Sequence, residues 1–284
     1  MATLALATQP VSCTLCGGDG SRLLCRNDSL EVARCTGCGL VFVNPQPTED
    51  ALRSYHAGAK LLSQDGWSSY FDHSSAQIRE LWEERLADLQ KWRPGTGVNL
   101  LDVGAGYGDF LYYAKKLGWK VSGFEFSPAA SRTSKQKYGI PLAVGDISEM
   151  EFPDRSFDVV TMWHVLEHLR DPLSALQRCR ELLVPEGILA IEVPNLNFVV
   201  RKSYRYPLSR TLHLYHFSPG TLSALVKKAG LEVLACGQGN TGFQYAHLWK
   251  IYAKKCLYVV SRSVEKLSGV NVADSIRLYA TPNR

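Results

Sequence analysis

The sequence predicts an open α/β fold in which a doubly wound parallel sheet is covered by helices on both faces. From about residue 99 onward, apolar runs of strand length alternate with segments of helical periodicity. The first run ends in Asp102, and glycines follow at positions 104, 106 and 108 before a helical pattern begins. This order of residues predicts a buried strand, then a tight turn, then the start of a helix. The backbone N–H groups at the start of such a helix can face a ligand.

The other elements of this part continue the alternation. The expected strands are residues 99–103, 121–126, 142–144, 157–163, 188–193, 231–236 and 275–280. The expected helices are residues 109–117, 128–138, 172–183, 219–229 and about 245–267. A Pro-Glu-Gly sequence at residues 185–187 is expected to separate the third of these helices from the strand that follows it.

Two Cys-x-x-Cys-Gly turns near the N-terminus predict a metal site. The first contains Cys13 and Cys16, the second contains Cys35 and Cys38, and eighteen residues separate the pairs. Four thiolates at this spacing are typical of tetrahedral structural zinc, which leaves no coordination position open for chemistry. We therefore expect a zinc ribbon over residues 1–45, with a short hairpin between the two turns.

Residues 46–95 are expected to form a helical linker or lid between the ribbon and the main sheet. A helix begins after Thr48, and residues 74–92 carry a single apolar stripe of helical periodicity. The stretch between these helices is aromatic and includes Tyr70, which is a candidate lid and substrate residue only through the family resemblance described below. A tyrosine packed in the core has the same sequence pattern, so both interpretations stay open.

Four motifs at the ends of expected strands resemble those of class I S-adenosylmethionine (SAM) methyltransferases, and the resemblance runs from about residue 99 to the C-terminus. The residues that carry it are Asp102, Gly104, Ala105, Gly106 and Gly108, then Glu125, Phe126 and Ser127, then Asp146 and Ile147, and finally Trp163 and His164. The resemblance implies a Rossmann-like seven-stranded sheet whose last strand is antiparallel. It also implies a methyltransferase core over residues 96–284, with a basic helical insertion at about 244–268.

The resemblance assigns cofactor-binding roles to these positions. The glycines would let the methionine part of SAM approach bare backbone, and Asp102 would fix this loop and reach the amino group through water. Glu125 would hold the ribose hydroxyls with Phe126 against the adenine, Asp146 would accept from the adenine amino group, and the backbone N–H of Ile147 would donate to the ring. Trp163 and His164 would face the reaction centre.

The segment after the fourth motif supplies candidate catalytic residues. His164 and His168 are candidate general bases because imidazole titrates near neutral pH. Glu167 and His168, with His213 and His216 downstream, resemble the metal-supporting cluster of ubiquinone-type O-methyltransferases and small-RNA 2′-O-methyltransferases. Those families carry Glu-x-x-Glu-His, whereas the first position here is His164. A catalytic divalent ion is therefore one interpretation, and a pocket-shaping role for Glu167 and His168 is the other.

The resemblance implies that the acceptor side follows the fifth strand, in an aromatic and basic segment. Its candidate substrate residues are Asn195, Arg201, Tyr204, His213 and His216. From residue 201 onward, thirteen Lys and Arg stand against three acidic residues. This excess of positive charge favours an acidic acceptor, for instance a phosphorylated, nucleotide-linked or lipid-linked glycan, or else nucleic acid.

These observations favour a SAM-dependent methyltransferase that acts on a small-molecule or carbohydrate-type acceptor, with oxygen as the expected atom. An RNA methyltransferase that docks through the ribbon is the main alternative, although the ribbon is neutral overall. Deoxysugar C-methyltransferases also place a ribbon ahead of this core but carry a further domain, so carbon methylation ranks lower. A SAM-binding scaffold without turnover is the alternative outside enzymes. Paired cysteines and the lack of a long apolar run predict a cytoplasmic protein without a membrane span.

Overall fold

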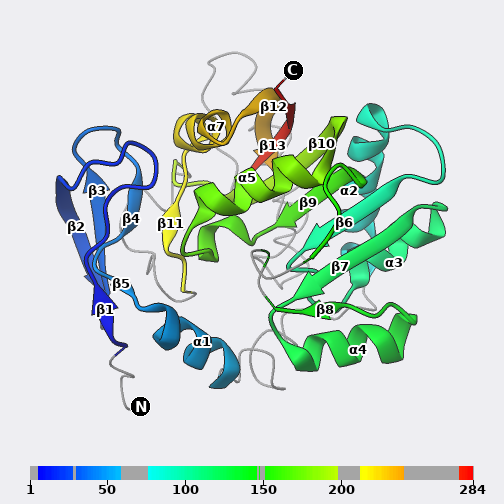
Figure 1. The fold of residues 1–284 in the computed structure, drawn as a ribbon, viewed down its shortest axis with the longest axis horizontal. Coiled ribbons are helices and arrows are strands. Elements are labelled where there is room, and N and C mark those ends of the chain that lie inside the picture. The colour runs from blue at the N-terminus through cyan, green and yellow to red at the C-terminus, as the bar shows by residue number, and fades with distance from the viewer. Residues whose placement is uncertain are drawn as a thin grey trace.

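The computed structural model describes residues 6–27, 30–58, 76–145, 147, 151–197, 212–239 and 275–283. In these ranges a large mixed sheet with its helices lies beside a smaller N-terminal sheet (Figure 1). The expected basic helix at about 244–268 and the candidate residues Tyr70, Asp146, Arg201 and Tyr204 lie outside the described residues.

The large sheet has the topology that the sequence predicts. Its strands are β6 (Asn99–Val103), β7 (Lys120–Glu125), β8 (Ala143–Val144), β9 (Phe157–Trp163), β10 (Leu183–Pro194), β12 (Leu231–Gly239) and β13 (Ser275–Pro282). They lie in the order β12-β13-β10-β9-β6-β7-β8, and only β13 runs antiparallel to its neighbours. The Rossmann-like seven-stranded sheet with an antiparallel last strand is therefore confirmed.

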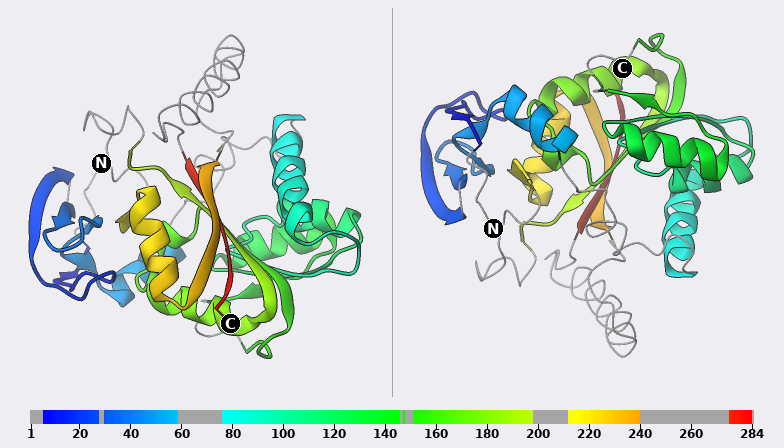
Figure 2. Two further views of the ribbon diagram at one scale, coloured as in Figure 1. Left: turned by 90° about the horizontal axis from the view of Figure 1, so that it is seen from above. Right: turned by 90° about the horizontal axis from the view of Figure 1, so that it is seen from below.

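Helices cover both faces of this sheet, as Figure 2 shows from above and below. They are α2 (Ala76–Trp92), α3 (Asp109–Lys116), α4 (Pro128–Tyr138), α5 (Pro172–Leu182) and α7 (Pro219–Lys228). One apolar core contains buried residues of α2 and α3, and a second contains those of α5 and α7. The sheet separates the two cores, so its strands are apolar on both sides, as expected for parallel strands under helices.

The start of β10 differs from the expectation. A break was expected at residues 185–187, but the strand begins at Leu183, which pairs with Phe157 of β9. The register then shifts, and pairing resumes between Ile188 and Val159. The Pro-Glu-Gly sequence is thus accommodated as a bulge inside one strand, because a bulge can hold a proline that has no N–H to donate.

The small sheet is built from the N-terminal ribbon and one strand of the core. β2 (Ser21–Asn27) and β3 (Leu30–Cys35) form the expected hairpin, and β4 (Val41–Val43) extends it. The fourth strand is β11 (Tyr215–His216), which pairs antiparallel with β4. Nearby, β1 (Thr8–Gln9) pairs with β5 (Gln46–Pro47) ahead of helix α1 (Glu49–Gly58). Among the described residues, no helix is both long and apolar enough to cross a membrane.

Candidate functional site

The loop between β6 and α3 has the conformation that its glycines require. Gly104, Gly106 and Gly108 have φ values of 70°, 55° and 79°. A Cβ atom on Gly104 would lie 2.5 Å from Cγ2 of Val165, so the position needs glycine for space as well as for its backbone angle. The loop therefore presents bare backbone at the carboxyl end of the sheet, where open α/β folds bind ligands.

Two carboxylates flank this loop. Glu125 ends β7, and its Oε2 and Oε1 accept hydrogen bonds from the backbone N–H groups of Gly106 (2.8 Å) and Ser127 (3.0 Å). Burial raises the pKa of Glu125, and these N–H groups oppose the shift. Asp102 is buried below the loop and accepts from Oγ1 of Thr161 at 2.6 Å, and burial raises its pKa to about 7.

The structure brings together most of the residues that were expected to hold the cofactor. Ala105 donates its backbone N–H to the carbonyl of Phe124, and Ser127 caps α4, so both belong to the framework of the loop. Phe126 is half-buried beside Glu125, whereas the side chain of Ile147 is buried in the core. The cofactor roles of these residues stay predictions.

His164 occupies a constrained position at the carboxyl end of β9. It is one of two non-glycine residues in the described ranges with a positive φ, here 58°. Its Nδ1 lies 3.4 Å from Oε1 of Glu167, and its Nε2 lies 3.5 Å from Oε1 of Glu192. Burial alone would lower the pKa of His164, but its contacts with the two carboxylates raise it to about 9. The ring is therefore protonated at neutral pH, which suits a donor better than a general base.

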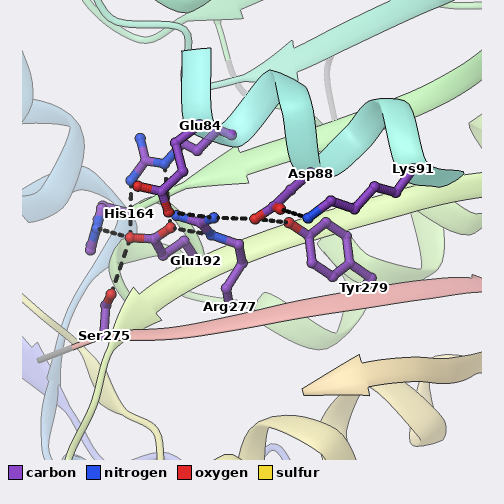
Figure 3. A network of polar contacts seen from close by, with 9 residues as sticks. Glu84, Asp88, Lys91, His164, Glu192, Ser275, Arg277 and Tyr279 are labelled. Atoms are coloured by element: carbon purple, nitrogen blue, oxygen red, sulfur yellow. Dashed lines mark hydrogen bonds and ion pairs between the residues drawn. The ribbon is translucent and has the colours of Figure 1, made fainter. Parts of the chain in front are cut away.

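Glu192 organises a buried network under His164, shown in Figure 3. It is 0% exposed and contacts Nη2 of Arg85 (3.0 Å), Nε of Arg277 (2.8 Å) and Oγ of Ser275 (3.1 Å). The guanidinium of Arg85 also lies between the rings of Trp82 and Trp163, at 4.6 Å and 4.5 Å from their centroids. Burial opposes ionisation of Glu192, but the two arginines hold its pKa well below the usual range.

The sequence pattern did not predict this network. One signal was available: Glu192 is an acidic residue within an otherwise apolar strand, and such a residue is buried only with a partner. The network joins α2, β10 and β13 to Trp163 and His164, so it links the helix before the core to the end of β9.

A second cluster lies on the other side of His164. Ligand atoms of Glu167, His168 and His213 all lie within 4.8 Å of one another. Glu167 is 1% exposed, and its carboxylate oxygens have no hydrogen-bond partner among the described residues. The Nδ1 of His168 lies 3.1 Å from the carbonyl of Leu212, which leaves Nε2 for another role. A buried carboxylate and two imidazoles fit a divalent cation, and the carbonyl contact is the usual outer partner of a histidine ligand.

Two further acceptor-side candidates sit at the edge of this cluster. His216 is buried on β11, with its ring centroid 6.2 Å from that of His213, and it does not belong to the group of three. Asn195 follows β10 and accepts from the backbone N–H of Asn197 at 2.9 Å. Its side chain is fully buried, so it shapes the loop after the strand.

The four ribbon cysteines also converge. Sulfur–sulfur distances are 3.5 Å for Cys13 and Cys38 and 3.4 Å for Cys16 and Cys35, and all four lie within 4.8 Å of one another. Four sulfurs at about 2.3 Å from one tetrahedral ion would be roughly 3.8 Å apart. The cluster therefore fits one metal ion.

Comparison with known proteins gives the family. A methyltransferase domain model matches residues 74–235, which is more than half of the chain. The ubiquinone biosynthesis O-methyltransferase of Histophilus somni is 33% identical over 132 residues, which cover 43% of this chain and 56% of that protein. The protein of the same name from Nitrosococcus oceani is 30% identical over 183 residues, which cover 59% of this chain and 76% of that one. A relative from Cereibacter sphaeroides is matched over 64% of its length, so the chain spans less than two thirds of some relatives.

Solved structures agree on the fold. A protein from Pyrococcus horikoshii OT3 superposes with a TM-score of 0.55 at 16% identity, covering 76% of this chain and 95% of that one. A SAM-dependent methyltransferase from Mesorhizobium loti gives 0.52 at 17% identity, covering 69% and 96%. Because the family model, the sheet order and the glycine loop agree, the chain belongs to the methyltransferase domain family.

Proposed function

We propose that this enzyme transfers the methyl group of SAM to an oxygen atom of a small-molecule or carbohydrate-type acceptor. The observation that carries the proposal is the cluster of Glu167, His168 and His213. Glu167 and His168 follow β9, and Val165 just before them lies against Gly104 of the glycine loop. Such a cluster can bind and deprotonate a hydroxyl group. The name O-methyltransferase of the relatives from Histophilus somni and Nitrosococcus oceani supports oxygen as the atom.

In this proposal the carboxyl ends of β6 and β7 bind the cofactor. The backbone of Gly104 and Gly106 lets the methionine part of SAM approach, and Glu125 accepts from the ribose hydroxyls. Glu125 is prepared for this because two N–H groups already fix its carboxylate. Asp102 holds the loop through Thr161 and offers negative charge toward the amino group of SAM. Bound SAM supplies a methyl group on a sulfonium, which is activated for in-line transfer without further help.

The acceptor half of the site, formed by Glu167, His168 and His213, has to orient the acceptor hydroxyl and take its proton. Nε2 of His168 is the proposed base, because its Nδ1 faces the carbonyl of Leu212 and donates to it. The acceptor oxygen forms its bond to the methyl carbon as the carbon–sulfur bond breaks, and the hydroxyl proton moves to His168. Glu167, His168 and His213 would hold a divalent cation, which would lower the pKa of that hydroxyl. Protonated His164 partly neutralises Glu167 when no cation is bound.

The proposed acceptor class is inferred from the positive charge of the C-terminal third of the chain. Separately, the four cysteines of the ribbon are proposed to bind structural zinc. The excess of Lys and Arg after residue 201 supports an acceptor that carries phosphate or another acidic group, such as a lipid-linked glycan. RNA would use the same charge, so the experiment must separate the two.

The experiment that tests the proposal incubates the purified enzyme with ¹³C-methyl SAM and an extract of its host. The products are separated into small molecules, glycans, lipid-linked material and RNA. Label in one of the first three fractions, with the carbon shift of an O-methyl group, is the expected result. Label only in RNA, or a shift typical of N-methyl or C-methyl groups, would overturn the proposal.

A further inference from the structure

The strand that carries His216 belongs to two parts of the molecule at once. In Figure 1, β11 lies beside β4 of the ribbon sheet. Tyr215 pairs with Phe42 and His216 with Val41, and the N–H of Val43 donates to the carbonyl of Leu214 at 2.8 Å. The ribbon sheet therefore takes its last strand from the core, and this strand begins two residues after His213.

The other side of the same segment is bonded to the candidate active site. The N–H of Leu214 donates to the carbonyl of Glu167 at 2.8 Å, and Nδ1 of His168 lies 3.1 Å from the carbonyl of Leu212. The hydroxyl of Tyr215 donates to the carbonyl of Arg170 at 3.0 Å. Residues 212–217, here named the bridging segment, thus lie between β4 and the turn that carries Glu167 and His168.

The ribbon side of this bridge continues directly into the cysteine cluster. β4 begins three residues after Cys38, and the N–H of Cys35 donates to the carbonyl of Leu40 at 2.8 Å. The rings of Phe42 and Tyr215 stack with centroids 6.4 Å apart. Cys13 and Cys35 are buried in the same apolar core as Val41 and Leu214. A second contact comes from Lys228 of α7, whose Nζ donates to the carbonyls of residues 14 and 15 at 3.0 Å.

Neither strand of the bridge is long enough to be stable alone. β4 has three residues and β11 has two, whereas isolated strand pairs are marginal in water even when longer. A ribbon of this size depends on its metal for folding. The pairing of the bridging segment with β4 therefore depends on the four cysteines, whereas its bonds to residues 167 and 170 come from the core.

We propose that the cysteine cluster, when it holds its metal, positions the acceptor half of the active site by fixing β4 and, through it, the bridging segment with His213. The ribbon is then a positioning part of the enzyme and not a separate docking module. The proposed SAM-binding half of the site lies at the carboxyl ends of β6 and β7, and neither strand pairs with the ribbon sheet. Loss of metal should consequently disorder one half of the site and spare the other. The inference rests on the proposed function only where it names the acceptor half.

Hydrogen exchange measured by mass spectrometry on the full chain tests this inference without using turnover. Cys16→Ser removes the most exposed of the four thiols and so weakens the metal site with little loss of packing. We expect exchange in peptides covering residues 212–217 to accelerate about tenfold or more, while peptides covering residues 99–125 are unchanged. SAM affinity, measured by calorimetry, should stay within about twofold.

A second variant separates the strand contact from the metal itself. Phe42→Ala removes the ring that stacks on Tyr215 and keeps all four cysteines. It should retain one zinc per chain by elemental analysis and still accelerate exchange in residues 212–217. Leu23→Ala is the matched control, since Leu23 lies on β2 at the far edge of the same sheet and is 46% exposed. Unchanged exchange in residues 212–217 in both Cys16→Ser and Phe42→Ala would overturn the inference, and so would equal acceleration in Leu23→Ala. Failure to methylate any acceptor would instead count against the proposed function.

Discussion

Replacing Glu192 by glutamine should destabilise the fold by about 3–5 kcal/mol, which is the usual result of removing one partner from a buried ion pair. Glutamine keeps the size of the side chain and removes only its charge. Arg277 would still contact Asp88 at 2.7 Å, so it keeps a counter-ion. Arg85 is 1% exposed and has Glu192 as its only carboxylate partner among the described ion pairs, so its charge would be left buried and unpaired.

The assay is equilibrium unfolding in urea at pH 7, in a buffer that contains zinc throughout. Glu84→Gln is the matched control, because Glu84 contacts the same Arg277 at 3.3 Å but has a side chain that is 40% exposed. Its loss should cost less than about 1 kcal/mol. The loss of stability in Arg85→Met should lie between those in Glu192→Gln and Glu84→Gln, because Glu192 would keep its contacts with Arg277 and Ser275. A loss of stability below about 1 kcal/mol for Glu192→Gln would show that Glu192 and the two arginines are not a tightly coupled buried ion-pair network.

Two further predictions concern the cofactor half. Asp102 has a pKa of about 7, and the ammonium group of SAM favours its ionised form, so SAM affinity should fall by up to about tenfold per pH unit as the pH drops below 7. Calorimetry between pH 5.5 and 8.5 checks this, and Asp102→Asn should abolish that part of the dependence; a flat wild-type profile would contradict it. Gly104→Ala should weaken SAM binding by about tenfold or more, because its Cβ would meet Val165. Gly139→Ala has a similar positive φ without a clash, so an equal loss of SAM affinity in the two variants would argue against close packing at residue 104 as the cause.

The sequence predicted the large sheet well because each of its inner strands is an apolar run bounded by turn residues. β6 and β9 have the expected limits, residues 99–103 and 157–163. Buried parallel strands give this signal locally, without knowledge of their neighbours. The glycine loop and its two carboxylates were predictable for the same reason, since each residue stands at a strand end that its own run defines.

Features that depend on distant pairs were not predictable in this way. Glu192 contacts Arg85 and Arg277, which are 107 and 85 residues away in the sequence. β11 has two residues, too few to show any periodicity, and its place in the ribbon sheet is set by backbone bonds to β4. The bulge at residues 185–187 was interpreted as a break because proline and glycine mark both. In each case the missing information is tertiary pairing, which single-sequence patterns do not contain.

The role of Glu167 is decided by comparing the wild-type enzyme with Glu167→Gln in one experiment. Transfer of labelled methyl groups from SAM to the host acceptor fraction is measured together with SAM affinity. We expect the variant to bind SAM within about twofold of wild type and to lose about a hundredfold or more of its transfer rate. Transfer at the wild-type rate by Glu167→Gln would contradict the assignment of the acceptor half to Glu167, His168 and His213.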